Sequence, residues 1–198
     1  MDVDSPLSAG RPLTEAEFAR SAAELAPALV GAVLVHGPVT ARIVEVEAYD
    51  PHDPASHSFI GPRPRTRAMF GPPGRLYVYR SYGLHWCANV VCSPDGVGAA
   101  VLLRAAEPLT GIELMFTRRP TAHHERELCA GPGRLCSALG LNGDHDGADL
   151  LDPDSPVRLL GSSTPGGELV CTTRVGITKA PTEPLRWYER HSRHISRR

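Results

Sequence analysis

Lysine is almost absent from this chain, because Lys179 is the only lysine among 21 basic residues. Aromatic residues make up only 6% of the sequence, and residues 54–94 contain no aspartate or glutamate. Hydrophobic runs are short, and none is close to the length of about 20 residues that a membrane-spanning helix needs. The acidic start, Met1-Asp2-Val3-Asp4, lacks the charged-then-apolar order of a secretory signal. We therefore expect a soluble, cytoplasmic protein that does not bind a membrane.

Paired cysteines are also missing. The chain has five cysteines, an odd number, and none of them forms a C-x-x-C pair. Disulfide frameworks use even sets and structural zinc sites use closely paired ones, so neither is expected. We predict that the cysteines are reduced thiols in the core of an intracellular protein.

The length of 198 residues and the hydrophobic content of 41% favour one compact domain. Residues 1–12 are expected to form a disordered leader and residues 13–198 the domain. Thr14-Glu15-Ala16-Glu17 has the form of a capping box, which predicts a helix that ends at Pro27 and is followed by a strand over residues 29–35. Further strands are predicted over residues 76–79, 86–92, 98–106 and 170–177, and helices over residues 109–115 and 131–139.

Charge is unevenly distributed, although the formal net charge is only −1. Residues 54–94 carry five arginines and no acid, whereas residues 135–157 carry five aspartates and no lysine or arginine. The basic region suits phosphate contacts and counterion release, although a genome-wide arginine bias explains the preference for arginine equally well. Its candidate contacts to a nucleic-acid backbone are Arg63, Arg65, Arg67 and Arg80.

Residues 44–49 alternate apolar and polar side chains, which predicts a strand with Glu45, Glu47 and Tyr49 on one face. Glu47 is our candidate for a general base that orients and deprotonates a water during glycosidic-bond hydrolysis. Glu45 competes for this role. A solvated strand glutamate without any catalytic role would show the same pattern.

Flat side chains near this strand are suited to hold a nucleobase outside the helical stack, since base–aromatic stacking is worth about 1–3 kcal/mol per base. Tyr49, His57 and Tyr79 are the candidates, and ordinary packing of tyrosines in strands is the alternative. His57 also lies near His52 and Asp53, but loop polar residues are commoner than metal ligands and no helical i, i+4 pair is present. No metal site is predicted.

A β-hairpin is predicted around Ser81-Tyr82-Gly83. Its turn places Tyr82 between Arg80 and His85, where an aromatic side chain is suited to enter the minor groove as a wedge. An exposed hairpin tyrosine without a role would look the same. The lack of any neighbouring acid favours the wedge.

Several distinctive segments follow one another between about Thr14 and Ser196. They are VEVEAY (44–49), DPASH (53–57), MFGPPG (69–74), YVYRSYG (77–83), LLRAAEPL (102–109), LCAGPGRLC (128–136), RVGI (174–177) and PLRWY (184–188). In order and spacing they closely resemble the alkyladenine (3-methyladenine) DNA glycosylase family.

This resemblance implies a monofunctional base-excision enzyme that hydrolyses the N-glycosidic bond of alkylated purines in duplex DNA and leaves an abasic site. It implies a single α+β domain built on a curved, mostly antiparallel sheet with flanking helices and a protruding β-hairpin. A monomer that acts on nucleoid DNA without lyase activity, metal or organic cofactor is expected.

The resemblance also implies roles for individual residues. Glu47 resembles the general base, and Arg104 and the backbone carbonyl of Val175 resemble its helpers in holding the attacking water. Tyr49 and His57 resemble the residues on one side of the flipped base.

On the other side of the base, Tyr79 resembles the stacking residue. Asn89 resembles the residue that excludes guanine through a clash with its exocyclic amine. Tyr82 resembles the intercalating wedge.

Three positions depart from the family pattern. The loop between Tyr49 and His57 is about one residue shorter, Leu84 replaces the usual methionine beside the wedge, and Thr66 stands where asparagine is common. Two other functional classes remain open, namely a catalytically silent sensor of damaged DNA and a hydrolase directed at small molecules or RNA. Glu47 together with Arg104 favours an enzyme over the sensor.

Overall fold

The structure, a computed structural model, describes residues 10–162 and 167–197. The strands, in chain order, are β1 Val33–His36, β2 Val39–Tyr49, β3 Leu76–Ser81, β4 His85–Cys92, β5 Ala99–Thr110, β6 Val157–Leu160, β7 Leu169–Thr172 and β8 Arg186–Glu189. The helices are α1 Glu15–Phe18, α2 Ala22–Leu29, the 3₁₀ helix η1 Pro64–Phe70, α3 Ile112–Arg118, α4 Glu125–Leu128, α5 Pro132–Leu139 and the 3₁₀ helix η2 Gly143–His145.

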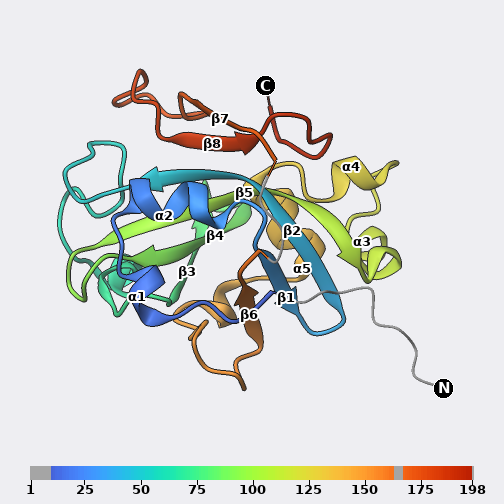
Figure 1. Ribbon diagram of the computed structural model, residues 1–198, viewed down its shortest axis with the longest axis horizontal. Helices are drawn as coiled ribbons and strands as arrows, with labels where there is room; N and C mark the ends of the chain where they lie inside the picture. Colours follow the sequence, from blue (N-terminus) through green and yellow to red (C-terminus); the bar gives the residue numbers. More distant parts are fainter. Residues whose placement is uncertain (1–9, 163–166, 198) are drawn as a thin grey trace.

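The described strands form one antiparallel sheet in the order β3-β4-β5-β2-β1-β6, and β8 pairs with both β2 and β7 (Figure 1). Register shifts between β2 and β5 on both sides of Glu45 mark a β-bulge, which increases the local twist of a strand. The predicted α+β class with a curved antiparallel sheet is confirmed.

The central strand β2 is buried on both faces. Val46 and Ala48 pack into the main hydrophobic core, as the alternation predicted, whereas Val44 lies at the bulge and, although buried, is not part of that cluster. Glu45 and Glu47 are each 0% exposed. The interpretation of these glutamates as a solvated face is therefore wrong. Strand β8 pairs with the edge of β2, and the Arg186 side chain and Ser196, which follows β8, bond Glu45 on this face. Local periodicity does not reveal these distant contacts.

The N-terminal helix is interrupted, contrary to prediction. Two capping boxes, one at Thr14 and one at Ser21, open α1 and α2 separately. Helix α2 continues through Pro27 to Leu29, because proline removes only one backbone donor there and Leu25 and Leu29 are buried in the core.

The predicted leader lies mostly in residues 1–9, outside the described part of the chain. Arg11 and Pro12 contact the domain: the Arg11 carbonyl accepts the Gly161 N–H at 2.8 Å, and Pro12 forms a β-bridge with Leu160. Their partner strand β6 was not predicted, because it is only four residues long and lies next to an acidic loop.

Other boundaries differ from the predictions. The strand predicted over residues 170–177 ends at Thr172, so Arg174 and Val175 lie in a loop. Strand β5 extends to Thr110, beyond the predicted end at residue 106, and α3 therefore begins at Ile112 instead of at residue 109. Four cysteines are buried as predicted, but Cys171 is exposed. No helix in the described ranges is long and apolar enough to span a membrane.

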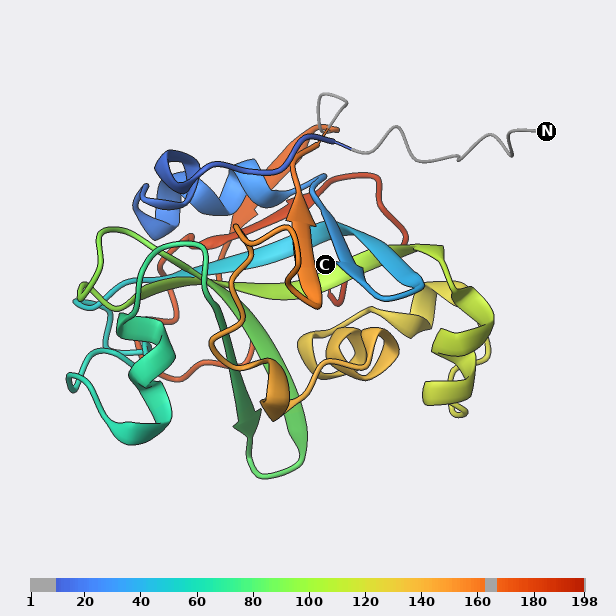
Figure 2. The same ribbon diagram turned by 90° about the horizontal axis from the view of Figure 1, so that it is seen from below.

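The predicted hairpin of β3 and β4 projects from the body of the molecule (Figure 2). Tyr82 lies at its turn with φ 50° and is 91% exposed. The base of the hairpin packs against β5 and η1, so the turn is presented on a rigid support.

Candidate active site

A cavity of about 750 Å³ opens over the sheet at the base of this hairpin. Its wall contains all eight residues that were predicted to form the catalytic site, the base pocket and the wedge: Glu47, Tyr49, His57, Tyr79, Tyr82, Asn89, Arg104 and Val175. They come from β2, β3, β4, β5 and three loops. The fold therefore assembles residues that are far apart in the sequence around one space.

Glu47 is held by donors on both carboxylate oxygens. Its Oε1 accepts the Val175 backbone N–H at 2.7 Å, and its Oε2 accepts the Tyr49 hydroxyl at 2.9 Å. Nη1 of Arg104 lies 3.2 Å from the same Oε2. These contacts fix the orientation of a buried carboxylate that borders the cavity. The expected helper at Val175 was its carbonyl, whereas the contact with Glu47 is made by its N–H.

Tyr49 stays a hydrogen-bond donor to Glu47. Burial raises the pKa of the Tyr49 hydroxyl, and the negative charge of Glu47 raises it further. The guanidinium carbon of Arg174 lies 4.7 Å from the centre of the Tyr49 ring and packs over its face.

Arg104 bridges the two glutamates of β2. Its Nε lies 2.9 Å from Oε1 of Glu45, and its Nη1 reaches Glu47. Burial by itself would lower the pKa of Arg104, but the carboxylates of Glu47 and Glu45 outweigh burial and raise it. Glu47 lines the cavity and Glu45 does not, so Glu47 is the carboxylate that a bound molecule meets.

Part of the cavity wall is aromatic. The rings of Tyr77 and Tyr79 are stacked, with centroids 5.5 Å apart, and His57 meets Tyr79 edge-on at 4.4 Å. His57 Nδ1 hydrogen-bonds the Tyr77 hydroxyl at 3.0 Å. Burial lowers the pKa of His57, and Arg65 lowers it further, so the ring is neutral at neutral pH. The shorter loop before His57 still brings it to the cavity.

Two further residues of the site were not predicted. Tyr77 contacts both His57 and Tyr79, and the backbone carbonyl of Tyr77 accepts a hydrogen bond from the Asn89 side-chain amide at 3.0 Å. The period-2 pattern of β3 was a signal for Tyr77, since it shares a face with Tyr79. Arg174 had no comparable local signal.

Arg174 connects the loops on either side of the cavity. Its Nη2 donates to Oδ1 of Asp53 at 3.1 Å, its Nη1 contacts Oδ2 of the same carboxylate, and Nη1 also donates to the Ala48 carbonyl at 3.1 Å. Asp53 is thus the partner of an arginine. No group of three or more side chains arranged to hold a metal ion occurs in residues 10–162 and 167–197.

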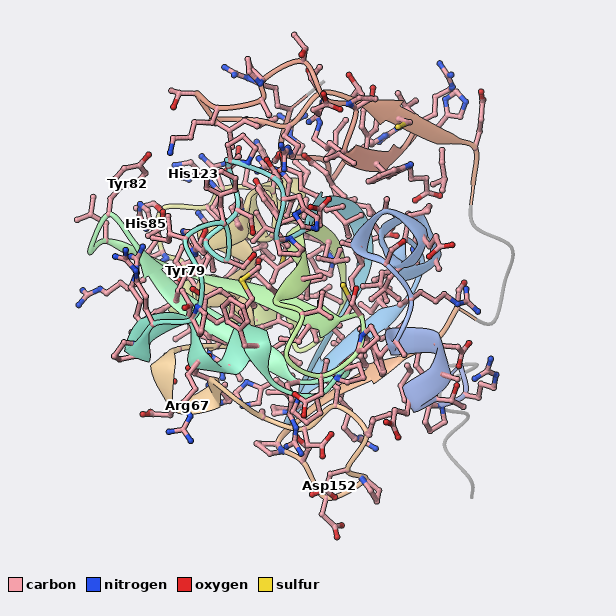
Figure 3. All side chains as sticks on the ribbon, turned by 90° about the vertical axis from the view of Figure 1, so that its left-hand side faces the viewer. Arg67, Tyr79, Tyr82, His85, His123 and Asp152 are labelled. Atoms are coloured by element: carbon pink, nitrogen blue, oxygen red, sulfur yellow. The ribbon has the colours of Figure 1, made fainter. Side chains whose placement is uncertain are left out.

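The four predicted DNA-contact arginines divide into two pairs. Arg65 and Arg80 line the cavity, whereas Arg63 and Arg67 are exposed outside its wall. Figure 3 shows Tyr82, His85 and Arg67 along one side of the molecule, with Asp152 at a separate end. One face thus combines the wedge candidate, the cavity and basic side chains.

Comparisons with known proteins show which family this chain is similar to. The sequence pattern described as Methylpurine-DNA glycosylase (MPG) matches residues 16–193. Similar proteins named "Putative 3-methyladenine DNA glycosylase" occur in Nitrobacter winogradskyi, with 48% identity over 99% of this chain and 92% of that protein, and in Rhodopseudomonas palustris, with 49% identity over 93% and 88%. A third, from Agrobacterium fabrum, is 49% identical over 91% of this chain and 90% of its own length. The chain belongs to the methylpurine-DNA glycosylase family.

Proposed function

We propose that this protein excises 3-methyladenine and related alkylated purines from duplex DNA by hydrolysing the N-glycosidic bond. The observation that carries the proposal is the buried carboxylate of Glu47, which is held by two hydrogen-bond donors and an ion pair with Arg104 at the wall of an aromatic cavity. The near full-length similarity to proteins named for 3-methyladenine supports the choice of lesion.

In the proposed reaction, Glu47 accepts a proton from a water whose oxygen attacks C1′ of the flipped nucleotide. The electron pair of the C1′–N bond moves to the base, which leaves, and the sugar retains the new hydroxyl group. Arg104 and the backbone carbonyl of Val175 help to hold the water. The positive charge that develops on the sugar is stabilised by the negative carboxylate nearby.

The pocket favours a cationic base. Arg174 packs over one face of Tyr49 and Tyr77 stacks on one face of Tyr79, so the opposite face of each ring is proposed to attract the positive charge of the base. His57 is neutral and therefore does not repel it. A base such as 3-methyladenine already carries the positive charge that makes it a good leaving group, so this step needs no general acid. Asn89 is proposed to exclude guanine through its exocyclic amine.

Tyr82 is proposed to enter the minor groove and fill the space that the flipped nucleotide leaves. Arg63, Arg65, Arg67 and Arg80 are proposed to contact the DNA backbone around it. Lysine is absent from the cavity wall, and the single lysine of the chain, Lys179, lies outside it. The proposed mechanism therefore ends at the abasic site without Schiff-base chemistry. We propose that the enzyme acts as a monomer on cytoplasmic DNA.

The test is release of free 3-methyladenine from methylated duplex DNA by the wild type and by Glu47→Gln. The variant should lose release by a factor of at least about 100, because a general base contributes about 10²–10⁴-fold. It should still bind a lesion-containing duplex, since the aromatic pocket is intact.

Glu113→Gln, at an exposed position in α3, is the matched control and should behave like the wild type. Full activity of Glu47→Gln would refute its role as the base. Tight lesion binding without any release by the wild type would instead identify a sensor of damaged DNA.

A further inference from the structure

Glu45 is fully buried and has four hydrogen-bond donors, although it does not line the cavity. Its Oε1 accepts from Nε of Arg104 at 2.9 Å, from Nη1 of Arg186 at 3.0 Å and from the Ser196 hydroxyl at 2.8 Å. Its Oε2 accepts the Ser196 backbone N–H at 2.6 Å. A buried carboxylate this extensively bonded is a fixed point in the structure.

Ser196 closes this cluster around Arg104. Its hydroxyl donates to Glu45 and accepts from Nη2 of Arg104 at 3.2 Å. Two of the three guanidinium nitrogens are therefore held, Nε by Glu45 and Nη2 by Ser196. The remaining nitrogen, Nη1, is the one that reaches Glu47.

The charges in this cluster are balanced. Glu45 and Glu47 face Arg104 and Arg186, and each of the four side chains is less than a tenth exposed. Arg186 is itself held by the carbonyl of Arg197, which accepts from its Nη1 at 2.9 Å. Because a guanidinium is planar, fixing Nε and Nη2 also fixes the direction of Nη1.

We propose that Glu45 and Ser196 are positioning residues that aim Arg104 at Glu47 and at the attacking water. The proposal rests on the function proposed above and extends it to the segment that follows β8. Neither residue touches the cavity, so both act on the rate of bond cleavage and leave the affinity for the lesion unchanged.

The experiment compares Ser196→Ala with Ser196→Thr. It measures single-turnover release of 3-methyladenine and, separately, the Kd for a lesion-containing duplex. Alanine removes the hydroxyl but keeps the backbone N–H that binds Glu45. We expect the single-turnover rate to fall about tenfold with an unchanged Kd, since a hydrogen bond to a charged group is lost. Threonine retains the hydroxyl and should restore the rate.

Ser192→Ala is the matched control, because Ser192 is a buried serine of the same segment. Within the described residues, its hydroxyl accepts the His194 N–H and forms no hydrogen bond with Arg104 or Glu45. It should keep the wild-type rate. Equal rates for Ser196→Ala and the wild type, or equal losses in Ser196→Ala and Ser192→Ala, would overturn the positioning role while leaving the proposed function intact. No release by the wild type would refute the proposed function and the positioning role together.

Discussion

At the scale of single residues, Tyr82 has two features that do not stabilise the fold. Its backbone is in the left-handed region, at φ 50°, which costs a non-glycine residue about 1 kcal/mol or more. Its large ring is 91% exposed and contributes nothing to the core. Both features are expected of a side chain held ready to insert into a partner.

Replacing Tyr82 by serine should therefore weaken binding without destabilising the protein. We expect the Kd for a lesion-containing duplex to rise about tenfold, because stacking on a base is worth about 1–3 kcal/mol and 1.4 kcal/mol is a factor of ten. The Tm should stay the same. Val97→Ser, at an apolar residue exposed in another turn, is the control. An unchanged Kd for Tyr82→Ser would remove the wedge assignment.

At the scale of elements, β3 is an edge strand whose free side is paired with the loop around η2. Gly147 N–H donates to the Leu76 carbonyl at 2.7 Å, and Leu76 N–H donates to the Ala148 carbonyl at 2.8 Å. Two residues further along β3, Oδ1 of Asp146 accepts the Val78 N–H at 2.8 Å. This loop replaces a neighbouring strand and holds the base of the hairpin that carries Tyr79 and Tyr82.

Asp146→Ala should loosen this attachment. Val78 is only 4% exposed, so loss of its acceptor leaves a buried N–H unsatisfied at a cost of about 1–3 kcal/mol. The free energy of unfolding, measured with urea, should fall by that amount. Asp144→Ala removes the same charge from the same loop, where both aspartates are exposed, but the Asp144 carboxylate makes no hydrogen bond within the described residues, so this variant should change stability little. Equal losses in the two variants would show that the bond to Val78 contributes nothing.

At the scale of the whole molecule, half-buried histidines couple stability to pH. Burial is the largest cause of the lowered pKa of His57, His145 and His194. His145 also faces His36, with 3.1 Å between their Nε2 atoms, and the neighbouring histidine lowers the pKa of His145 further. A histidine with a lowered pKa binds fewer protons when folded than when unfolded.

Their contribution to stability is therefore fully present above the unfolded pKa of about 6.5 and is lost as the pH falls. The Tm should be lower at about pH 5.5 than at about pH 7.5, a window in which Glu17, whose pKa is about 2, stays ionised. His145→Gln should show a smaller difference in Tm between the two pH values. A Tm that rises on acidification would contradict this linkage.

Local sequence patterns predict several of the strands and the hairpin. The alternation of residues 44–49 predicted both the strand β2 and its shared glutamate face, and the turn residues predicted the hairpin of β3 and β4. Such features depend on side chains two to four positions apart, which the sequence displays directly. Short elements such as β6, and the interruption between α1 and α2, depend on distant packing and were not predicted.

Local sequence patterns are enough to select the candidate residues, but the contacts among those residues depend on the folded chain. The periodicity of the sequence does not distinguish Glu45 from Glu47, because the two residues lie two positions apart on the same strand face. They differ because Val175, which is 128 residues away, binds Glu47 beside the cavity, whereas Ser196, which is 151 residues away, binds Glu45 behind it. Contacts over such separations arise only when the chain is folded, so the proposed roles of Glu47 as base and Glu45 as positioning residue rest on the tertiary structure.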